Sequence, residues 1–508
     1  MASRRDELNA YTFAKRRLIA QFVQPNSTGS EEGAPRPLRA VLPGVIVGVV
    51  ILAAFGAWGM FKPVAPKGWD AVNENVIIAS KSTTRYVVLR TGRTKQLHPV
   101  LNMASAKLLL DQDKGKVINV SESVIDRSDL AHGPTVGIPY APDRLPDAKE
   151  AGAAKRWAVC ERPSAGGRAI QKAAFVLAKR EQGRTEGAER LRGGELLYVE
   201  GPDKVRYVVD AEGKAYRVKK DELLLRQVVG ADRKPQRVTA AWLETLHQGG
   251  TIDFPAITGT PGADPNAPGA LLPKEANKVG MVLVAPVNSK NQQYVVLPGR
   301  VAPVTDFTAK LLLSSKELVT VGQAGRAMSV SPGAIEPGEP FGQDKDWPRS
   351  DPTPVNEAGT DAGSRNTVCS VLRDVDDADG GATTLSTWAG TDFPKPLPTG
   401  SSAYVTPGSG QLFRQFQGSS TASGFVFLVT DTGLRYGMQS NGDSAADEPG
   451  IGAGTAQERL ARQQEAQQAQ NRLGYQDVAP APVPAAWATF LPTGPRLSTA
   501  AARQIQGS

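Results

Sequence analysis

The residues best suited to chemistry in this chain are two cysteines and three histidines. Cys160 and Cys369 lie far apart in the sequence, and His98, His132 and His247 are scattered, with no histidine near a cysteine or another histidine. A zinc site needs closely spaced ligands such as a CxxC pair or an HExxH helix, and neither spacing occurs here. We therefore predict no metal site, and we expect the histidines to be ordinary structural residues.

The motifs of nucleotide-dependent and hydrolytic enzymes are also missing from the sequence. Gly115-Lys116 and Gly213-Lys214 lack the spacing and the following hydroxyl of a phosphate-binding loop. There is no GxSxG nucleophile elbow, no protein-kinase motif set and no GxGxxG turn of a dinucleotide-binding strand. Two carboxylates that act together in hydrolysis need not be close in sequence, so a hydrolase of that kind stays open. The sequence thus indicates no catalytic residue and no cofactor site.

The composition excludes some classes of protein. The 508 residues suffice for several domains. The 52 glycines and 38 prolines predict many turns and linkers rather than a helical bundle. The formal net charge of +8 is spread thinly, and aromatic residues make up only 6%. Nucleic-acid binding requires clustered basic side chains and stacking rings, so we expect no nucleic-acid partner.

An uncharged apolar segment runs between Arg39 and Lys62. Its 21 residues, 41–61, match the roughly 20 residues that a helix needs to cross a bilayer. Trp58 and Trp69 fall where the outer membrane interface is expected. A cleaved signal peptide is the alternative, because AAFGA supplies small residues at the end of the apolar run. The forty residues before the run are too many for such a leader, so we predict a transmembrane helix.

Positive charges are distributed unevenly around this segment. Only Lys62 and Lys67 occur in the first residues after it, whereas the preceding residues include Arg4, Arg5, Lys15, Arg16, Arg17, Arg36 and Arg39. Because the cytoplasmic side of a span carries the excess of Lys and Arg, the N-terminus is predicted to be cytoplasmic. The protein is therefore predicted to cross the cytoplasmic membrane once, with its bulk outside the cytoplasm.

This topology changes the expectation for the two cysteines. Outside the cytoplasm a pair of cysteines is expected to be oxidised, so Cys160 and Cys369 are predicted to form a disulfide. Two free buried thiols are the alternative, because the sequence does not show whether the residues are close in space.

A short helix is predicted at the N-terminus. Ser3 and Asp6 have the spacing of a capping box. Behind them one helical face collects apolar residues and the rest is basic, which is typical of an amphipathic helix. Either its charges fix the topology and contact acidic lipid headgroups, or it docks onto another cytoplasmic or membrane subunit. The apolar positions are Leu8, Tyr11, Leu18 and Phe22, and the basic ones are Arg4, Arg5, Lys15, Arg16 and Arg17.

One pattern recurs in the outer region of the chain. A YVVL strand, a glycine turn, a second strand containing Pro-Val and an AKLLL helix follow one another at 86–110 and again at 294–313. Each copy predicts strand, tight turn, strand and amphipathic helix. Weaker copies with the same outline occur at 207–225 and 425–436. The motif residues that we single out are Tyr86, Leu97, His98, Pro99, Val100, Asn102 and Tyr294.

The cysteines follow the same repetition. Tyr86 precedes Cys160 by 74 positions, Tyr294 precedes Cys369 by 75, and each cysteine follows a valine. The chain is therefore predicted to use one unit twice: a repeat, a Val-Cys strand and a second repeat. Such a duplication can close around a pseudo-twofold axis, on or near which a disulfide between equivalent cysteines would lie.

Together these patterns predict an α+β protein with one N-terminal transmembrane helix, followed outside the cytoplasm by four small repeats and two Val-Cys segments that can be related by a pseudo-twofold axis. The predicted regions are a cytoplasmic tail at 1–40, the span at 41–61, repeat 1 at 69–146, a first core segment at 150–190, repeat 2 at 191–270, repeat 3 at 278–345, a second core segment at 365–400, repeat 4 at 401–445, and a polar helix with the C-terminal segment at 455–508.

Several segments together resemble one known family over nearly the whole chain. They are MASRRDELNAYTFAKRRL at the start, LHPVLNMASAKLLL, GIPYAPDRLP, and near the end Leu473-Gly474-Tyr475, Pro484, Trp487, Leu491-Pro492 and Gly494-Pro495-Arg496-Leu497. In order and spacing they resemble the EccB family, a core membrane component of the actinobacterial type VII (ESX) secretion system. This chain departs from the family at Tyr140, where GIPGAPD is usual, and in the Gln-rich stretch AQERLARQQEAQQAQNRL.

The resemblance implies an elongated β-rich extracytoplasmic region of four small repeats around a central core with one disulfide. It also implies a structural subunit that helps to assemble and stabilise the secretion channel in the cytoplasmic membrane. Its implied partners are a multi-span channel subunit, an FtsK/SpoIIIE-type motor ATPase and other type VII core subunits. The family's repeats are similar to a cell-wall-binding phage lysin module, so a wall anchor that binds peptidoglycan is one alternative. The other is an ATP-hydrolysing component, because the family is sometimes described as having ATPase activity. This sequence gives that activity no physical support, and we predict no cofactor.

Overall fold

The computed structural model describes residues 3–23, 38–61, 65–164, 166–267, 271–361, 363–438 and 467–506. The chain divides into two compact units, one comprising residues 1–69, 79–82 and 119–129, the other comprising residues 70–78, 83–118 and 130–508. Residues 456–466 of the predicted polar stretch at 456–473 lie outside the described residues, as do residues 1–2 and 24–37 of the predicted tail.

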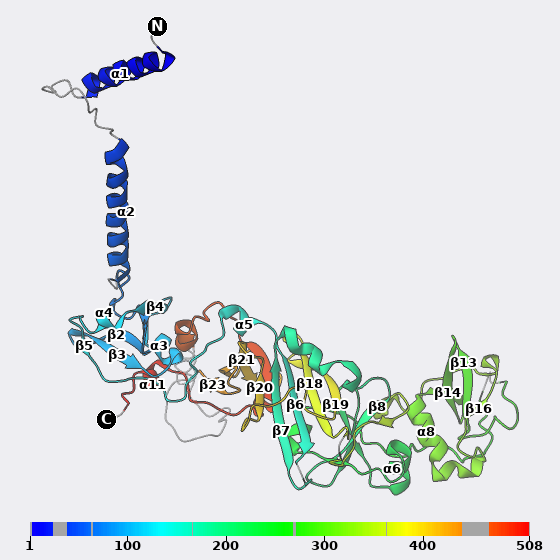
Figure 1. The fold of residues 1–508 in the computed structure, drawn as a ribbon. Coiled ribbons are helices and arrows are strands. Elements are labelled where there is room, and N and C mark those ends of the chain that lie inside the picture. The colour runs from blue at the N-terminus through cyan, green and yellow to red at the C-terminus, as the bar shows by residue number, and fades with distance from the viewer. Residues whose placement is uncertain are drawn as a thin grey trace. The chain divides into compact units, whose positions relative to one another are not determined.

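The first unit contains two long helices, α1 (Arg4–Val23) and α2 (Leu38–Phe61), and the short α4 (Glu122–Ile125) (Figure 1). The Ser3 amide donates to the Asp6 carboxylate at 3.3 Å, which is half of the predicted capping box. Within α2, residues 41–58 have a mean hydropathy of 2.3. By length and composition this helix can cross a membrane, as predicted.

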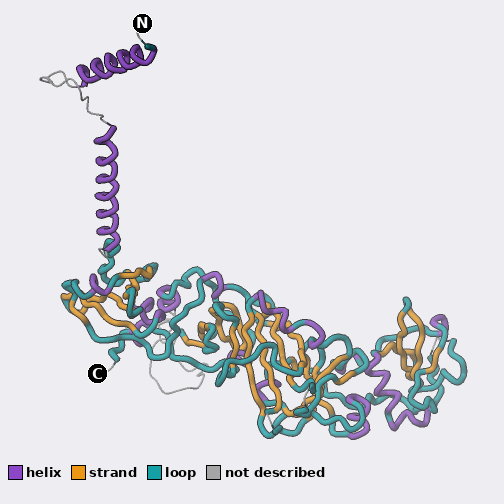
Figure 2. The backbone as a smooth tube through the Cα atoms, viewed as in Figure 1, coloured by secondary structure: helices purple, strands orange, loops and turns teal. Residues whose placement is uncertain are grey.

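A five-stranded sheet forms the centre of the second unit, in the order β19-β18-β6-β7-β20 (Figures 1 and 2). Its two hairpins, β6–β7 and β18–β19, are joined through the antiparallel pair β6–β18. The sheet and its 3-10 helices comprise β6 (Arg156–Pro163), β7 (Ile170–Leu177), β18 (Thr367–Asp376), β19 (Ala382–Gly390), β20 (Ala403–Val405), η1 (Lys179–Thr185) and η2 (Gly187–Glu189).

Four smaller sheets accompany this central sheet, and we name them with their helices repeats 1 to 4. Repeat 1 has the strand order β4-β1-β2-β3-β5. Repeat 2 has the order β11-β8-β9-β10-β12, with β17 beside β8. The elements of repeat 1 are β1 (Asn75–Ala79), β2 (Arg85–Thr91), β3 (Thr94–Val100), α3 (Met103–Leu109), β4 (Lys116–Val120) and β5 (Ala131–His132), followed by α5 (Ala148–Gly152). The elements of repeat 2 are β8 (Glu195–Glu200), β9 (Arg206–Val209), β10 (Lys214–Val218), α6 (Glu222–Val229), β11 (Gln236–Arg237), α7 (Ala240–Leu243), β12 (His247–Gln248) and β17 (Thr353–Pro354).

Repeats 3 and 4 have the orders β15-β14-β13-β16 and β23-β22-β21-β24. Repeat 3 comprises β13 (Val282–Val287), β14 (Lys290–Leu297), β15 (Arg300–Val304), α8 (Asp306–Ser314), η3 (Lys316–Val321), β16 (Met328–Ser329), η4 (Pro332–Ala334) and η5 (Gln343–Lys345). Repeat 4 comprises β21 (Gly410–Phe416), β22 (Phe425–Thr430), β23 (Arg435–Gly437), β24 (Ala481–Pro484), α10 (Ala485–Ala488) and α11 (Thr499–Ala502). The sheet of repeat 4 therefore takes a strand from the C-terminal segment, which the sequence patterns indicate as a separate region.

One topology underlies the repeats. Three antiparallel strands come first, and a later short segment then pairs parallel with the third strand in all four. In repeats 2, 3 and 4 a second late strand also pairs parallel with the first strand. The predicted strand, turn, strand and helix pattern is thus the middle part of a larger unit, which also includes the strand before it and the late parallel strands after it.

The repeats share hydrophobic cores in pairs. Leu224 and Val228 of α6 pack with Phe307 and Leu311 of α8, which joins repeat 2 to repeat 3. The apolar side of α3 in repeat 1 packs with the chain that leads into β24 of repeat 4, through residues 469–478. A pseudo-twofold axis that exchanges repeat 1 with repeat 3 and repeat 2 with repeat 4 relates these two pairs. The predicted arrangement of four repeats around a core is confirmed.

Candidate functional site

The two cysteines lie opposite each other on the two strands that join the halves of the central sheet. Cys160 of β6 pairs in register with Cys369 of β18, and their Sγ atoms are bonded at 2.07 Å. Both residues are fully buried. The disulfide closes a loop of 209 residues, so it links regions of the chain that local structure could not hold together.

The register around the disulfide shows where the pseudo-twofold axis lies. Val159 pairs with Ser370 and Glu161 with Val368, so the residue before one cysteine always faces the residue after the other. Strands related by a twofold axis pair in this way when the axis passes through the disulfide. The two equivalent cysteines are therefore bonded to each other on the axis.

A buried carboxylate attaches repeat 2 to the disulfide-bearing strand. Glu161, fully buried next to Cys160, accepts hydrogen bonds from the backbone N–H and the hydroxyl of Thr239. Thr239 in turn caps α7, and the indole of Trp242 in that helix donates to the Val159 carbonyl at 3.1 Å. Burial raises the pKa of Glu161, although the bonds from Thr239 oppose the shift.

A second carboxylate, Glu186, binds three guanidinium groups beside the central sheet. Arg190 donates to it at 2.9 Å, and Arg156 of β6 and Arg373 of β18 also pair with it. Partial burial alone would raise the pKa of Glu186, but the hydrogen bonds from Arg373 and Arg190 outweigh it and lower the pKa to about 2. The cluster thus fixes the η1–η2 segment to both central strands.

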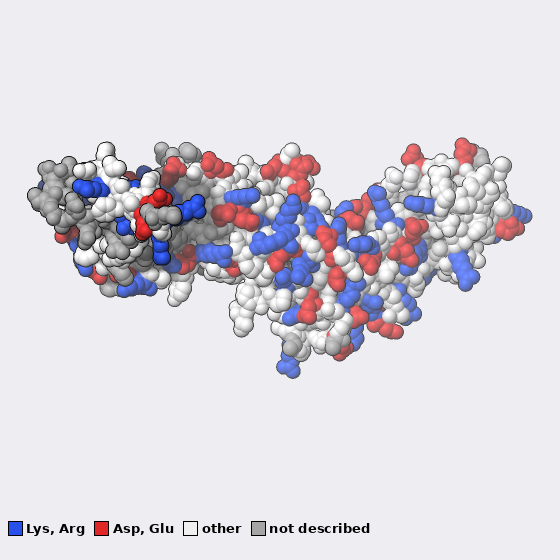
Figure 3. Space-filling model, turned by 45° about the horizontal axis from the view of Figure 1, so that its top comes forward, with Lys and Arg blue, Asp and Glu red and all other residues white. Residues whose placement is uncertain are grey.

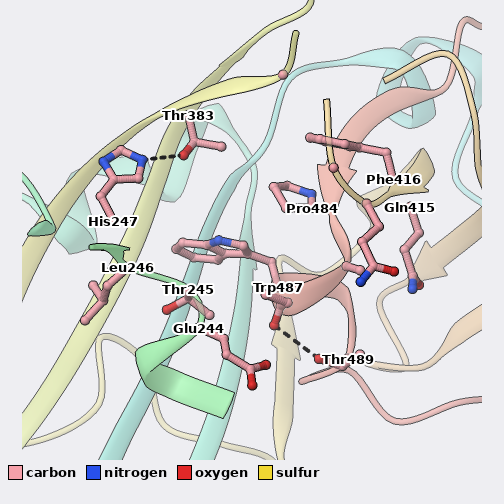
Figure 4. A pocket seen from close by; sticks show the side chains of 15 residues that line it. Glu244, Thr245, Leu246, His247, Thr383, Gln415, Phe416, Pro484, Trp487 and Thr489 are labelled. Carbon is pink, nitrogen blue, oxygen red and sulfur yellow. Dashed lines mark hydrogen bonds between the residues drawn. The ribbon is translucent and has the colours of Figure 1, made fainter. Parts of the chain in front are cut away.

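A pocket of about 470 Å³ lies where repeats 2 and 4 meet the β18–β19 hairpin (Figure 4). Four segments that are remote in sequence form it: the residues after α7, the start of β19, the end of β21, and the end of β24 with α10. Its lining residues are Glu244, Thr245, Leu246, His247, Gly381, Thr383, Gln415, Phe416, Gln417, Gly418, Pro484, Ala485, Ala486, Trp487 and Thr489.

The pocket has an apolar interior and a polar rim. Trp487, drawn near the centre of Figure 4, is 2% exposed and contributes to the wall. At the rim, Nε2 of His247 is 2.8 Å from the Thr383 hydroxyl, a contact that joins repeat 2 to the hairpin. Burial, together with repulsion from Lys214, lowers the pKa of His247. The ring is therefore neutral at neutral pH, and Glu244 is the charged side chain of the lining.

The predicted basic tail residues are brought together on α1. Arg4, Arg5, Lys15, Arg16 and Arg17 are all exposed there, and so are the apolar Leu8, Tyr11, Leu18 and Phe22. Over the face drawn in Figure 3, basic and acidic side chains are interspersed rather than gathered by sign.

The predicted repeat-motif residues lie on the paired strands of the repeats and at the N-terminal cap of α3. Tyr86 lies opposite Pro99 in β2–β3, as Tyr294 lies opposite Pro303 in β14–β15. Asn102 caps α3 by accepting from the Ser105 amide at 3.0 Å. The buried motif residues are Leu97, His98, Val100, Asn102 and Tyr294.

The three histidines lie on three strands: His98 on β3, His132 on the neighbouring strand β5, and His247 on β12. His98 is buried with Nδ1 2.9 Å from the Pro134 carbonyl oxygen, whereas His132 and His247 are exposed on β5 and β12. Among the described residues no group of three or more His, Cys, Asp or Glu side chains could hold a metal ion.

One motif that the structure makes important was not predicted from the sequence. Ala240-Ala241-Trp242 in α7 and Ala485-Ala486-Trp487 in α10 are equivalent helices of repeats 2 and 4. Both tryptophans belong to the core cluster on one face of the central sheet. A comparison of the ends of the weaker repeats could have found the shared AAW.

Comparison with known proteins places this architecture. The family model described as type VII secretion system ESX-1, transport TM domain B, matches residues 1–507. The ESX-1 secretion system ATPase EccB1 of Mycolicibacterium smegmatis (strain MKD8) is 26% identical over 310 residues, which are 60% of this chain and 60% of that relative. The ESX-3 secretion system ATPase EccB3 of Mycobacterium tuberculosis (strain ATCC 25618 / H37Rv) is 26% identical over 526 residues, covering 98% of this chain and 88% of the relative.

Solved structures share the fold. A chain of an intact ESX-5 inner membrane complex superposes with a TM-score of 0.57 at 20% identity, covering 100% of this chain and 96% of that one. A chain of an EccB3 dimer from the ESX-3 core complex gives 0.53 at 22% identity, covering 84% and 99%. From the family match over residues 1–507, the protein described here belongs to the EccB family of type VII secretion systems.

Proposed function

We propose that this protein is a structural subunit of a type VII secretion membrane core complex, which it helps to assemble and stabilise. The observation that carries the proposal is the disulfide at the centre of the duplicated fold, in a chain whose second helix, α2, is long and apolar enough to cross a membrane. A buried bond that unites two halves of a chain is typical of a stable framework outside the reducing cytoplasm. Chains with this fold are found in ESX inner membrane complexes.

The topology in this proposal has the N-terminus in the cytoplasm and the second unit outside the membrane. The basic residues of α1 precede α2, and the excess of positive charge marks the cytoplasmic side of a span. The disulfide supports the same orientation, because it would be reduced in the cytoplasm. Protease added to spheroplasts should digest the second unit and leave a short fragment containing α1. Protection of the disulfide-bearing unit would contradict this orientation.

The proposed partners are a multi-span channel subunit, an FtsK/SpoIIIE-type motor ATPase and other type VII core subunits. Purification of tagged full-length protein in mild detergent, with mass spectrometry of the associated proteins, tests this directly. Co-purification of both partner types is expected. A partner-free protein would contradict the structural role, and assays of ATP turnover and peptidoglycan binding on the same preparation would then decide between the alternatives.

A further inference from the structure

The pocket between repeats 2 and 4 is a preformed cavity. Its walls come from α7, from the β18–β19 hairpin, and from β21 and α10, all of which pack on or belong to the disulfide-linked sheet. The hairpin turn is tightly fitted against repeat 4, because a Cβ atom at Gly381 would lie 2.7 Å from the Phe416 ring. A volume of about 470 Å³ is within the roughly 300–1,000 Å³ of pockets that take specific ligands.

The charge in the lining is one-sided. Glu244 is exposed at the rim and makes no ion pair or hydrogen bond with any side chain among the described residues. No lysine or arginine lines the pocket. The nearby Lys214, which pairs with His247 in register, is bound to Asp346 at 2.9 Å. The imidazole of His247 is held by Thr383 and leaves Glu244 uncompensated.

The apolar interior and the unpaired carboxylate of Glu244 together favour one kind of side chain in the pocket. An anion would be repelled by Glu244, and a purely apolar group would bury that carboxylate without a partner. A lysine or arginine side chain satisfies both requirements, because its methylene stem packs on apolar surface while its charged head pairs with a carboxylate. The stem would lie against Pro484, Ala485, Ala486 and Phe416.

We propose that this pocket receives a lysine or arginine side chain from a protein segment of another subunit of the complex. The inference rests on the proposed function, since it requires an assembly that supplies such a segment outside the membrane. It adds a defined docking point at the junction of repeats 2 and 4 and the β18–β19 hairpin.

The test is site-specific photo-crosslinking in the full-length protein within its membrane complex. A benzophenone amino acid at Gln417, an exposed rim position, reports on whatever enters the pocket. We expect a crosslinked peptide from another polypeptide that contains a lysine or arginine. Its yield should fall roughly two- to fivefold in Glu244→Gln, as for loss of one exposed ion pair. It should fall similarly in Thr489→Lys, which supplies a competing ammonium at the rim.

The matched control is Thr320→Lys, an exposed threonine of repeat 3 outside the lining, which should leave the yield unchanged. Mobility on a non-reducing gel checks that each variant retains its disulfide. The proposal is overturned by a yield that ignores Glu244→Gln and Thr489→Lys, by a crosslinked peptide without a basic residue, or by a crosslink to lipid or glycan. If the partners co-purify but no crosslink forms, this inference fails alone. If they do not co-purify, the proposed function fails.

Discussion

The same short helix is used differently in repeats 2 and 4. In repeat 2, α7 begins at the capping residue Thr239, which Glu161 holds, and its Trp242 donates to the central strand. In repeat 4, α10 begins after Pro484, has no side-chain cap, and places Trp487 in the wall of the pocket. Ser370 occupies the position on β18 that is equivalent to Glu161 on β6. Hydrogen bonds therefore fix α7 of repeat 2 to the central sheet, whereas α10 of repeat 4 borders the pocket.

This difference indicates how a duplicated scaffold acquires a binding surface. The helix of repeat 2 is fixed to the core and is followed by the rim residues Glu244 and His247, whereas the helix of repeat 4 contributes Trp487 to the wall of the pocket. If the interpretation is correct, substitutions at equivalent positions should have unequal effects.

The largest expected difference concerns the two tryptophans. Trp242→Ala should lower the free energy of unfolding by about 3–5 kcal/mol, because it leaves a cavity in a dry core and removes the partner of the Val159 carbonyl. Trp487→Ala should cost less, because one side of that ring borders the pocket. Urea unfolding of the full chain in detergent, followed by near-UV circular dichroism, measures both. Equal losses would contradict the distinction between the copies.

Removal of the disulfide should affect both copies together. The double variant Cys160→Ser, Cys369→Ser should lose about 2–5 kcal/mol of unfolding free energy, because the bond closes a loop of 209 residues. The same urea titration, with and without reductant, measures this. The wild type in reductant should approach the double variant, and the double variant should not respond to reductant. A wild type that is unaffected by complete reduction would argue against a structural role for the bond.

Substitutions at the N-caps of α7 and α10 should change the free energy of unfolding by smaller amounts, and in opposite directions. Thr239→Ala removes a cap and the hydroxyl that donates one of the two hydrogen bonds from Thr239 to the buried Glu161, so a loss of about 1–3 kcal/mol is expected. Pro484→Ser supplies a hydroxyl where α10 lacks a cap and should gain about 0.5 kcal/mol or less. Thermal unfolding of the two variants beside the wild type is sufficient. A stabilising Thr239→Ala would contradict the proposed attachment of α7.

The smallest effect is a dependence on pH. Because the pKa of Glu161 is raised in the folded protein above its value of 4.5, the folded state holds this proton more tightly than the unfolded state. Its contribution to stability is fully present below pH 4.5 and is lost as the pH rises through the folded pKa. The difference in unfolding free energy between Glu161→Gln and wild type should therefore move in favour of Gln as the pH rises. A difference between Glu161→Gln and wild type that does not change with pH would contradict the buried environment of Glu161.

Much of this fold follows from local sequence patterns. The apolar run of α2 and the YVVL and AKLLL repeats have periodicities that specify a spanning helix and a strand–turn–strand–helix unit. The nearly equal spacing of Tyr86 to Cys160 and Tyr294 to Cys369 predicts a symmetric core. These features depend on residues close in sequence or on a spacing that a duplication preserves.

The remaining features depend on contacts between distant segments, which no local pattern encodes. Some of the late strands that complete the repeats are very short. β11 and β12, for example, have too few residues to show an alternation of apolar and polar positions in the sequence. Repeat 4 is completed by β24, far from β23 in sequence. The pocket combines residues 244–247 with residues 484–489, so it exists only once repeats 2 and 4 are docked.

The claim that the disulfide-linked core organises a membrane complex is tested most directly by assembly in cells. Membranes from cells that express either wild type or the Cys160→Ser, Cys369→Ser variant as the only copy would be solubilised and separated on native gels. We predict that the variant still inserts into the membrane but that the large complex is lost or strongly reduced. An undiminished complex with the variant chain incorporated would contradict the role of this core as the framework for assembly.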